Sequence, residues 1–270
     1  IRRPPRSTLS SSSAASDVYK RQVQQLKLFP TQSGNQKIID WSINASVGQI
    51  VESHTDALGH RIYNIYLNNV TSDQKIIAKG TVHTKNTYGV MKGLNDKVHP
   101  DCFLRQTELT RPNRKIMNLV KGIEPNSIVF CHKMNKAVSR SIKYLTGSTD
   151  INTNAQKAVT IGTGVCQDFA HILIGLARYN NYPARYVNGF IANDSNIEGS
   201  DTHAWVEIFI KDLGWVGFDP SHHTCVDQKY VRFSCGYDFS HSSMIKGVKS
   251  NFKGQETLSK EINIDLQTSQ

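Results

Sequence analysis

The stretch Thr163-Gly164-Val165-Cys166-Gln167-Asp168-Phe169-Ala170-His171 joins a small, turn-forming segment to the start of an amphipathic helix. Cys166 lies in the first turn of a helix predicted over residues 166–180, where unpaired N–H groups and the positive helix end favour a thiolate. At about 100° per residue, Cys166 also falls on the apolar stripe of this helix, together with Phe169, Ala170, Ile172, Leu173, Leu176 and Ala177. The pattern predicts either a nucleophilic thiol or an inert buried cysteine.

Three β-runs follow this helix, over residues 184–191, 202–210 and 214–219. Asp219 ends the third run. In the second run, aliphatic residues alternate with a set that projects to the opposite face, namely His203, Trp205, Glu207 and Phe209. A cysteine on a helix start, a histidine on a strand and a carboxylate on the neighbouring strand are the parts of a thiol-based acyl-transfer site. Their contact is an inference, because sequence does not fix strand register.

The residues before Cys166 divide into a β-rich part and a helical part. Apolar residues at helical intervals predict helices over 114–120, 129–145 and 154–160. Short runs rich in β-branched and aromatic residues predict an all-β, sandwich-like unit with strands at 25–29, 38–43, 61–67 and 75–83. We therefore expect an N-terminal β domain over residues 23–105 and a catalytic core over 106–270.

Residues 1–22 have no apolar periodicity and open with a Pro/Arg and Ser/Ala-rich run. They resemble the translated adaptor read-through found at the ends of assembled environmental sequences. We expect a non-native, disordered leader, and a native disordered basic tail is the alternative.

The composition favours a globular protein and argues against several other classes. The chain has 270 residues and a formal net charge of +10, but residues 1–22 contribute +4 of this and the other cations form no stripe interleaved with aromatics. No apolar run approaches the roughly 18 residues of a membrane span. Five cysteines without a CxxC pair, and no signal-peptide pattern, favour a reducing, cytoplasmic setting. We expect a protein or peptide substrate, with no nucleic-acid or membrane partner.

Four segments in order resemble the successive motifs of the bacterial transglutaminase-like superfamily: residues 163–171, 183–190, 202–207 and 214–221. The segment Gly236-Tyr237-Asp238-Phe239-Ser240 with Gly247-Val248 is similar to the tail of that family. The resemblance implies an α+β fold, in which an N-terminal β-sandwich-like domain precedes a papain-like core of helices packed on an antiparallel sheet. It further implies that Cys166 is the nucleophile, His203 the general base and acid, and Asp219 the residue that orients the imidazole.

Two segments depart from the family pattern. Cys235 stands where an Arg-bearing segment is usual, and His222-His223-Thr224-Cys225 replaces the common turn after the Asp-Pro-Ser/Thr motif. These departures concern substrate preference rather than the three chemical positions.

The expected chemistry is thiol-dependent acyl transfer through a thioester, with the Cys166 backbone N–H among the oxyanion donors. Water as the second nucleophile gives a cysteine peptidase or amidohydrolase, whereas a lysine amine gives a protein-glutamine gamma-glutamyltransferase. The polar stretch 193–201 before His203 predicts a rim open to solvent, which favours hydrolysis. A non-catalytic interaction module with the same fold is the alternative.

Other candidate residues have a packing interpretation beside a functional one. Trp205 and Trp215 could wall an acyl tunnel and bind substrate, or pack in the core. We expect His171 on the surface or supporting the site, and Asp168 at the helix start. Soft zinc ligands occur without tight paired spacing, so no metal and no cofactor is predicted; they are His222, His223, Cys225, Cys235 and His241.

Overall fold

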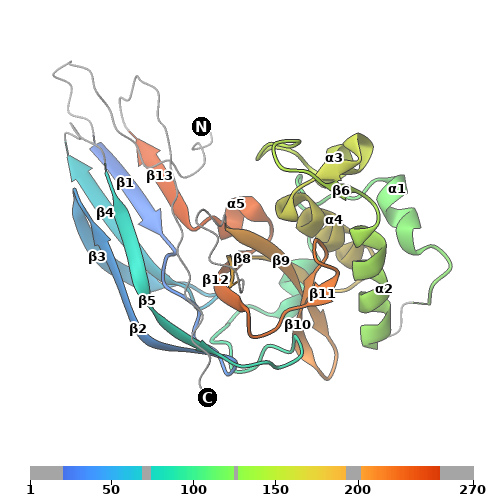
Figure 1. The fold of residues 1–270 in the computed structure, drawn as a ribbon, viewed down its shortest axis with the longest axis horizontal. Helices are drawn as coiled ribbons and strands as arrows, with labels where there is room; N and C mark the ends of the chain where they lie inside the picture. The colour runs from blue at the N-terminus through green and yellow to red at the C-terminus, as the bar shows by residue number, and fades with distance from the viewer. Residues whose placement is uncertain (1–20, 69–73, 125–126, 193–201, 250–270) are drawn as a thin grey trace.

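The computed structural model describes residues 21–68, 74–124, 127–192 and 202–249, which form two β-sheet regions and a group of helices (Figure 1). The predicted leader therefore lies outside the described residues, except that Arg21 and Gln22 begin the first strand. No helix in the described part of the chain is both long and apolar enough to cross a membrane.

The core sheet is antiparallel and has the strand order β11-β10-β9-β8-β12. Its strands are β8 (Ala184–Ile191), β9 (His203–Ile210), β10 (Gly214–Asp219), β11 (Thr224–Cys225) and β12 (Tyr230–Gly236). The sequence predicted β8 and β10 with these bounds, and β9 within one residue. It did not predict β11 or β12, whose runs are short or interrupted by polar residues.

The helical elements are η1 (Pro100–Leu104), α1 (Arg114–Met117), η2 (Asn118–Val120), α2 (Ser127–Ser139), α3 (Ala155–Ile161), α4 (Cys166–Tyr179) and α5 (Phe239–Ser242). Of these, α1, α2, α3 and α4 gather on one side of the core sheet (Figure 1). Asn154 caps α3 by accepting the Lys157 backbone N–H, and Gly162 ends it with a positive φ of 80°. The helix expected to reach residue 145 ends at Ser139, and residues 143 and 144 form β6 (Lys143–Tyr144), which pairs with β7 (Thr163–Gly164).

Helix α4 is the centre of the main hydrophobic core. Its buried side chains, among them Ile172, Leu173 and Leu176, pack against the aliphatic face of β9, which presents Val206 and Ile208. At Gly175 the helix meets the segment before α1 so closely that an added Cβ would lie 2.0 Å from the Thr110 carbonyl oxygen. The packing of α4 on β9 therefore fixes the position of Cys166 at the helix start.

The N-terminal region consists of a four-stranded sheet with order β13-β1-β4-β3 and a two-stranded ribbon of β2 and β5. These strands are β1 (Arg21–Leu26), β2 (Gln36–Ala45), β3 (Gln49–Thr55), β4 (Arg61–Asn68), β5 (Ile76–Thr84) and β13 (Ile245–Lys249). Ile43, Ala45 and Ile76 of the ribbon pack on the buried residues of the sheet, which makes the unit sandwich-like as expected. The expected domain boundary at residue 105 would put β13 in the core, but β13 pairs with β1 and so belongs to the N-terminal sheet.

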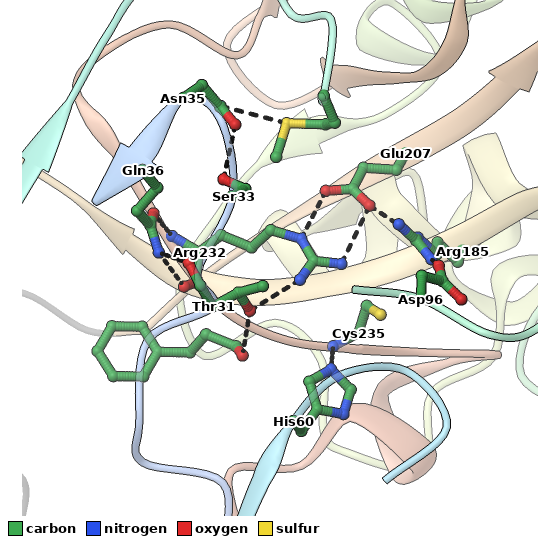
Figure 2. Close-up of polar contacts among 12 residues, drawn as sticks. Thr31, Ser33, Asn35, Gln36, His60, Asp96, Arg185, Glu207, Arg232 and Cys235 are labelled. Atoms are coloured by element: carbon green, nitrogen blue, oxygen red, sulfur yellow. Dashed lines mark hydrogen bonds and ion pairs between the residues drawn. The ribbon is translucent and has the colours of Figure 1, made fainter. Parts of the chain in front are cut away.

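A buried charge network joins this unit to the core sheet (Figure 2). Glu207 of β9 accepts from Arg185 Nε at 2.7 Å and from Arg232 Nε at 2.7 Å, and Arg185 also pairs with Asp96. Arg232 extends the network by donating to Thr31 Oγ1 at 2.8 Å. Glu207 of β9 therefore lies on the side of the N-terminal residues, while the aliphatic members of β9 lie against α4.

Candidate functional site

Cys166 is the first residue of α4, and the turn before it is held by Asp168. The Asp168 carboxylate accepts the Val165 backbone N–H at 2.8 Å and the Thr149 hydroxyl at 2.6 Å. Because Cys166 opens the helix, its backbone N–H has no acceptor within the helix. The thiol is free and partly exposed, so it sits at the accessible end of an otherwise buried helix.

His203 opens β9, and its ring lies between the other two predicted site residues. Its Nε2 is 2.7 Å from Oδ2 of Asp219, the last residue of β10. The thiol of Cys166 lies close enough to the same imidazole to help raise the pKa of His203, and Nδ1 is the ring nitrogen that Asp219 does not occupy. The structure thus brings together three residues that are separated by up to 53 positions in the sequence.

The two partners control the charge of His203. Burial alone would lower the pKa of His203, but the hydrogen bonds to Asp219 and Cys166 outweigh it and raise the pKa to about 9. At neutral pH the imidazole therefore carries a proton and can donate to both neighbours.

Asp219 is fully buried and is held by more donors than His203 alone. Burial would raise its pKa, but hydrogen bonds from His203 and His222 hold the pKa of this carboxyl well below its usual range. His222 Nδ1 lies 2.8 Å from Oδ2, and the Tyr230 hydroxyl donates to the same oxygen at 2.8 Å. Ser221 donates to Oδ1 from its hydroxyl at 2.6 Å and from its backbone N–H at 2.9 Å.

Sequence reasoning did not assign His222, Ser221 or Tyr230 to this site. The position of His222, three residues after Asp219 in a turn, is a local signal that could have placed its ring against the carboxylate. Tyr230 offered no such signal, because it reaches Asp219 through the pairing of β12 with β8, which is a long-range contact.

The two tryptophans predicted to bind substrate have almost no exposed surface and therefore belong to the core. Trp205 is 1% exposed and packs with Tyr230, and its ring stacks on His203 with centroids 6.3 Å apart. Trp215 is 7% exposed and belongs to a cluster with Phe103. The guanidinium carbon of Arg185 lies 3.9 Å from the centroid of the Trp215 ring. This burial favours the packing interpretation, and a role in substrate binding stays a prediction.

Three further sequence expectations meet different outcomes. The surface position expected for His171 is wrong, because its side chain is fully buried and its Nε2 accepts the Phe239 backbone N–H at 3.2 Å. Asp168 does lie at the helix start, where it acts by direct hydrogen bonding. The polar stretch 193–201 expected to form an open rim lies outside the described residues.

The soft ligands noted in the sequence separate into different places. Cys235 is buried beside His60, whose Nε2 accepts its backbone N–H at 2.9 Å (Figure 2). Burial would raise the pKa of Cys235, but Arg185, Arg232 and His60 lower it to about 6. His241 of α5 hydrogen bonds to Asp238, the residue that caps this helix, whereas His222 hydrogen bonds to Asp219.

Comparisons with known proteins agree with this architecture. The family model described as the Transglutaminase-like superfamily matches residues 118–220, which include Cys166, His203 and Asp219. The uncharacterized protein Rv2569c of Mycobacterium tuberculosis is 34% identical over 115 residues, covering 39% of this chain and 37% of the relative. The uncharacterized protein ML0607 of Mycobacterium leprae is 29% identical over 163 residues, covering 56% of each. The chain thus spans between about a third and about half of the length of these relatives.

One solved structure shares the fold over nearly the whole chain. It is a crystal structure named "Putative Cysteine Protease" from Cytophaga hutchinsonii, with a TM-score of 0.68, 20% identity, and coverage of 93% of this chain and 90% of the other. This likeness confirms the predicted α+β fold, including the N-terminal strands. The family match covers the segment that carries the three residues, so residues 118–220 are similar to the core domain of the transglutaminase-like superfamily.

Proposed function

We propose that this protein hydrolyses amide or peptide bonds of protein or peptide substrates through a thioester on Cys166. One observation carries the proposal: a partly exposed thiol at a helix start lies beside His203, whose Nε2 is held by the buried Asp219. The name of the Cytophaga hutchinsonii neighbour points to the same class of chemistry.

The proposed reaction needs a nucleophile, a proton carrier and an oxyanion donor. His203 holds the proton of Cys166 in a thiolate–imidazolium pair, and the thiolate attacks the carbonyl carbon of the scissile amide. The backbone N–H of Cys166 lies at the positive end of α4, where it can donate to the developing oxyanion. His203 then returns the proton to the leaving amine as the C–N bond breaks, which leaves the thioester.

Water completes the cycle by attacking the thioester carbonyl while His203 takes one of its protons. Collapse of the second tetrahedral intermediate breaks the C–S bond, releases the acid and restores the thiolate–imidazolium pair. Asp219 stays ionised throughout, fixes the imidazole and stabilises its protonated form.

The burial of the tryptophans supports hydrolysis over cross-linking. A cross-linking enzyme has to exclude water from the thioester and admit a lysine side chain, which requires a bulky-walled tunnel. Trp205 and Trp215 are the tryptophans nearest in sequence to the site, and both side chains are buried in hydrophobic clusters. Gamma-glutamyl transfer to an amine is the competing outcome of the test below.

Alkylation distinguishes an enzyme from a non-catalytic module. At mildly acidic pH, iodoacetamide should modify Cys166 much faster than Cys102, which is exposed in η1 and serves as the internal reference. The His203→Ala variant should lose this difference, because the thiolate then lacks its imidazolium partner. Equal rates at the two cysteines in the unmodified protein would favour the interaction module.

The reaction type is tested by mass spectrometry of a peptide library incubated with the protein, with and without an added primary amine. We expect new free acids or cleaved peptides in both samples, absent with Cys166→Ala. Amine-linked products with little free acid would show that cross-linking prevails.

A further inference from the structure

The turn after β10 places a second imidazole on the carboxylate that orients His203. Nε2 of His203 and Nδ1 of His222 lie 2.7 and 2.8 Å from the same oxygen, Oδ2 of Asp219. The three atoms that could bind a metal ion, two imidazole nitrogens and one carboxylate oxygen, lie within 4.8 Å of one another. The centroids of the two imidazole rings are 5.1 Å apart. Two imidazole nitrogens thus meet at one carboxylate oxygen.

This donor set matches a particular class of cation. Imidazole with a carboxylate suits Zn²⁺, Co²⁺, Ni²⁺ and Cu²⁺, whereas Mg²⁺ and Ca²⁺ prefer sites made of oxygen alone. We propose that His203, Asp219 and His222 bind a divalent transition metal ion such as Zn²⁺, and that the bound ion holds the protein inactive. The inhibition rests on the proposed hydrolase function, whereas the binding does not.

The carboxylate at this site is already fixed in the orientation that a ligand needs. Ser221 holds Oδ1 through two hydrogen bonds, and the Tyr230 hydroxyl holds Oδ2 from the buried side. Such supporting hydrogen bonds orient metal ligands and strengthen binding. The His222 side chain is 56% exposed, so an ion reaches the site from solvent past this ring.

Only a small movement converts the hydrogen-bonded cluster to a metal site. Zinc–ligand distances of about 2.0 to 2.2 Å in a tetrahedral site place neighbouring donor atoms roughly 3.3 Å apart. The two nitrogen–oxygen separations at Asp219 must therefore open by about half an ångström. His222 lies on an exposed turn and can make this shift, whereas the opening between His203 and Asp219 requires their side chains to rotate at the ends of β9 and β10.

Metal binding would remove the base from the proposed reaction. The ion takes the lone pair of His203 Nε2, and the proton on that nitrogen leaves to solvent. Nδ1 then keeps its own proton, so the ring cannot accept another from Cys166. The thiol of Cys166 is not among the three ligand atoms of this cluster.

The binding test uses Co²⁺ as a spectroscopic probe in the full chain with Cys166→Ala, which removes the competing thiol, and with any affinity tag cleaved. We expect one visible absorption transition that saturates at one ion per chain and is displaced by Zn²⁺ but not by Mg²⁺ or Ca²⁺. Adding His222→Ala or His222→Gln should weaken Co²⁺ binding at least about tenfold. His223→Ala changes the exposed neighbour and should leave binding unchanged. No saturable binding, or equal binding after both His222 substitutions, would overturn the proposal.

The activity test applies once a substrate has been found. Zn²⁺ should inhibit the unmodified protein, a chelator should restore it, and His222→Ala should need at least about ten times more Zn²⁺ for half inhibition. Unchanged Zn²⁺ sensitivity in His222→Ala would overturn the inhibitory role. If the protein hydrolyses no substrate, the proposed function is wrong. The Co²⁺ titration still shows whether His203, Asp219 and His222 bind a metal ion.

Discussion

The carboxylate of Asp168 accepts the backbone N–H of Val165 across 2.8 Å, so the residue two positions after Cys166 fixes the residue immediately before it. The same oxygen accepts the Thr149 hydroxyl, which ties this turn to the loop before α3. The thiol is therefore positioned by a buried side chain of its own helix as well as by the core beneath it.

Replacing Asp168 with alanine should lower both stability and activity. The Val165 N–H and the Thr149 hydroxyl would lose their acceptor, at a cost of about 1 to 2 kcal/mol in the free energy of unfolding. Asp168→Asn keeps an oxygen that can accept both bonds and should cost less. Urea denaturation measures the two costs, and equal losses would show that the hydrogen bonds are not the cause.

Removing Cys166 or His203 should abolish activity to the same level. The two side chains act as one unit, so the double variant Cys166→Ala/His203→Ala should be no slower than either single variant. Hydrolysis of a substrate identified from the peptide library gives the three rates. Full turnover by Cys166→Ala would contradict the nucleophile assignment.

Tyr230→Phe should loosen Asp219 without disturbing the core. The ring still packs on Trp205, but the carboxylate loses a donor at 2.8 Å. A hydrogen bond to a charged group contributes about 1.5 to 3 kcal/mol, so we expect a stability loss in this range and a slower reaction. Chemical denaturation and the turnover rate check it, and an unchanged stability would mean that water replaces the hydroxyl.

Gly175→Ala should destabilise the protein although alanine is the better helix former. Helix propensity alone would favour alanine by about 1 kcal/mol. The added Cβ would meet the Thr110 carbonyl oxygen at 2.0 Å, so α4 or the segment before α1 must move. We expect a net loss of about 1 to 3 kcal/mol, measured by urea denaturation. A more stable variant would contradict the close approach.

The Glu207 network should make stability depend on acid pH. Burial alone would raise the pKa of Glu207, but Arg232 and Arg185 outweigh it and lower the pKa to about 2 from its ordinary value of 4.5. Between these values the unfolded chain binds more protons than the folded one, so the contribution present above pH 4.5 is lost as pH falls toward 2.

The matched variant for this prediction is Glu207→Gln. It should lose about 3 to 5 kcal/mol at neutral pH, because two buried arginines lose their shared anion, and its stability should fall less on acidification. Urea denaturation over a pH series checks both effects. An acid slope equal to that of the unmodified protein would assign the loss to other carboxyls.

The accuracy of the sequence predictions follows the range of the interactions. The start of α4 and the strands β8 and β10 were predicted because their apolar periodicities are local and strong. Strands β12 and β13 were missed because Arg232 and Lys246 interrupt the apolar pattern, and only distant partners make these runs extended.

The same distinction applies to the candidate site. The alternation in β9 correctly put Glu207 on the face away from the aliphatic residues that pack on α4. It could not show that Arg232 neutralises Glu207, or that Tyr230 and His222 share Asp219 with His203. Those contacts depend on register and on turn conformation, which one sequence does not fix.

The pairing of β1 with β13 has a consequence for biosynthesis. Residues 21–26 leave the ribosome more than 200 residues before Ile245–Lys249 can join them. At roughly 5 to 20 residues per second, one edge of β1 waits on the order of 10 to 40 s for its neighbour. During that interval the nascent chain presents an open strand edge, so the sheet that β1 begins cannot close until the strand at the far end of the core has been made.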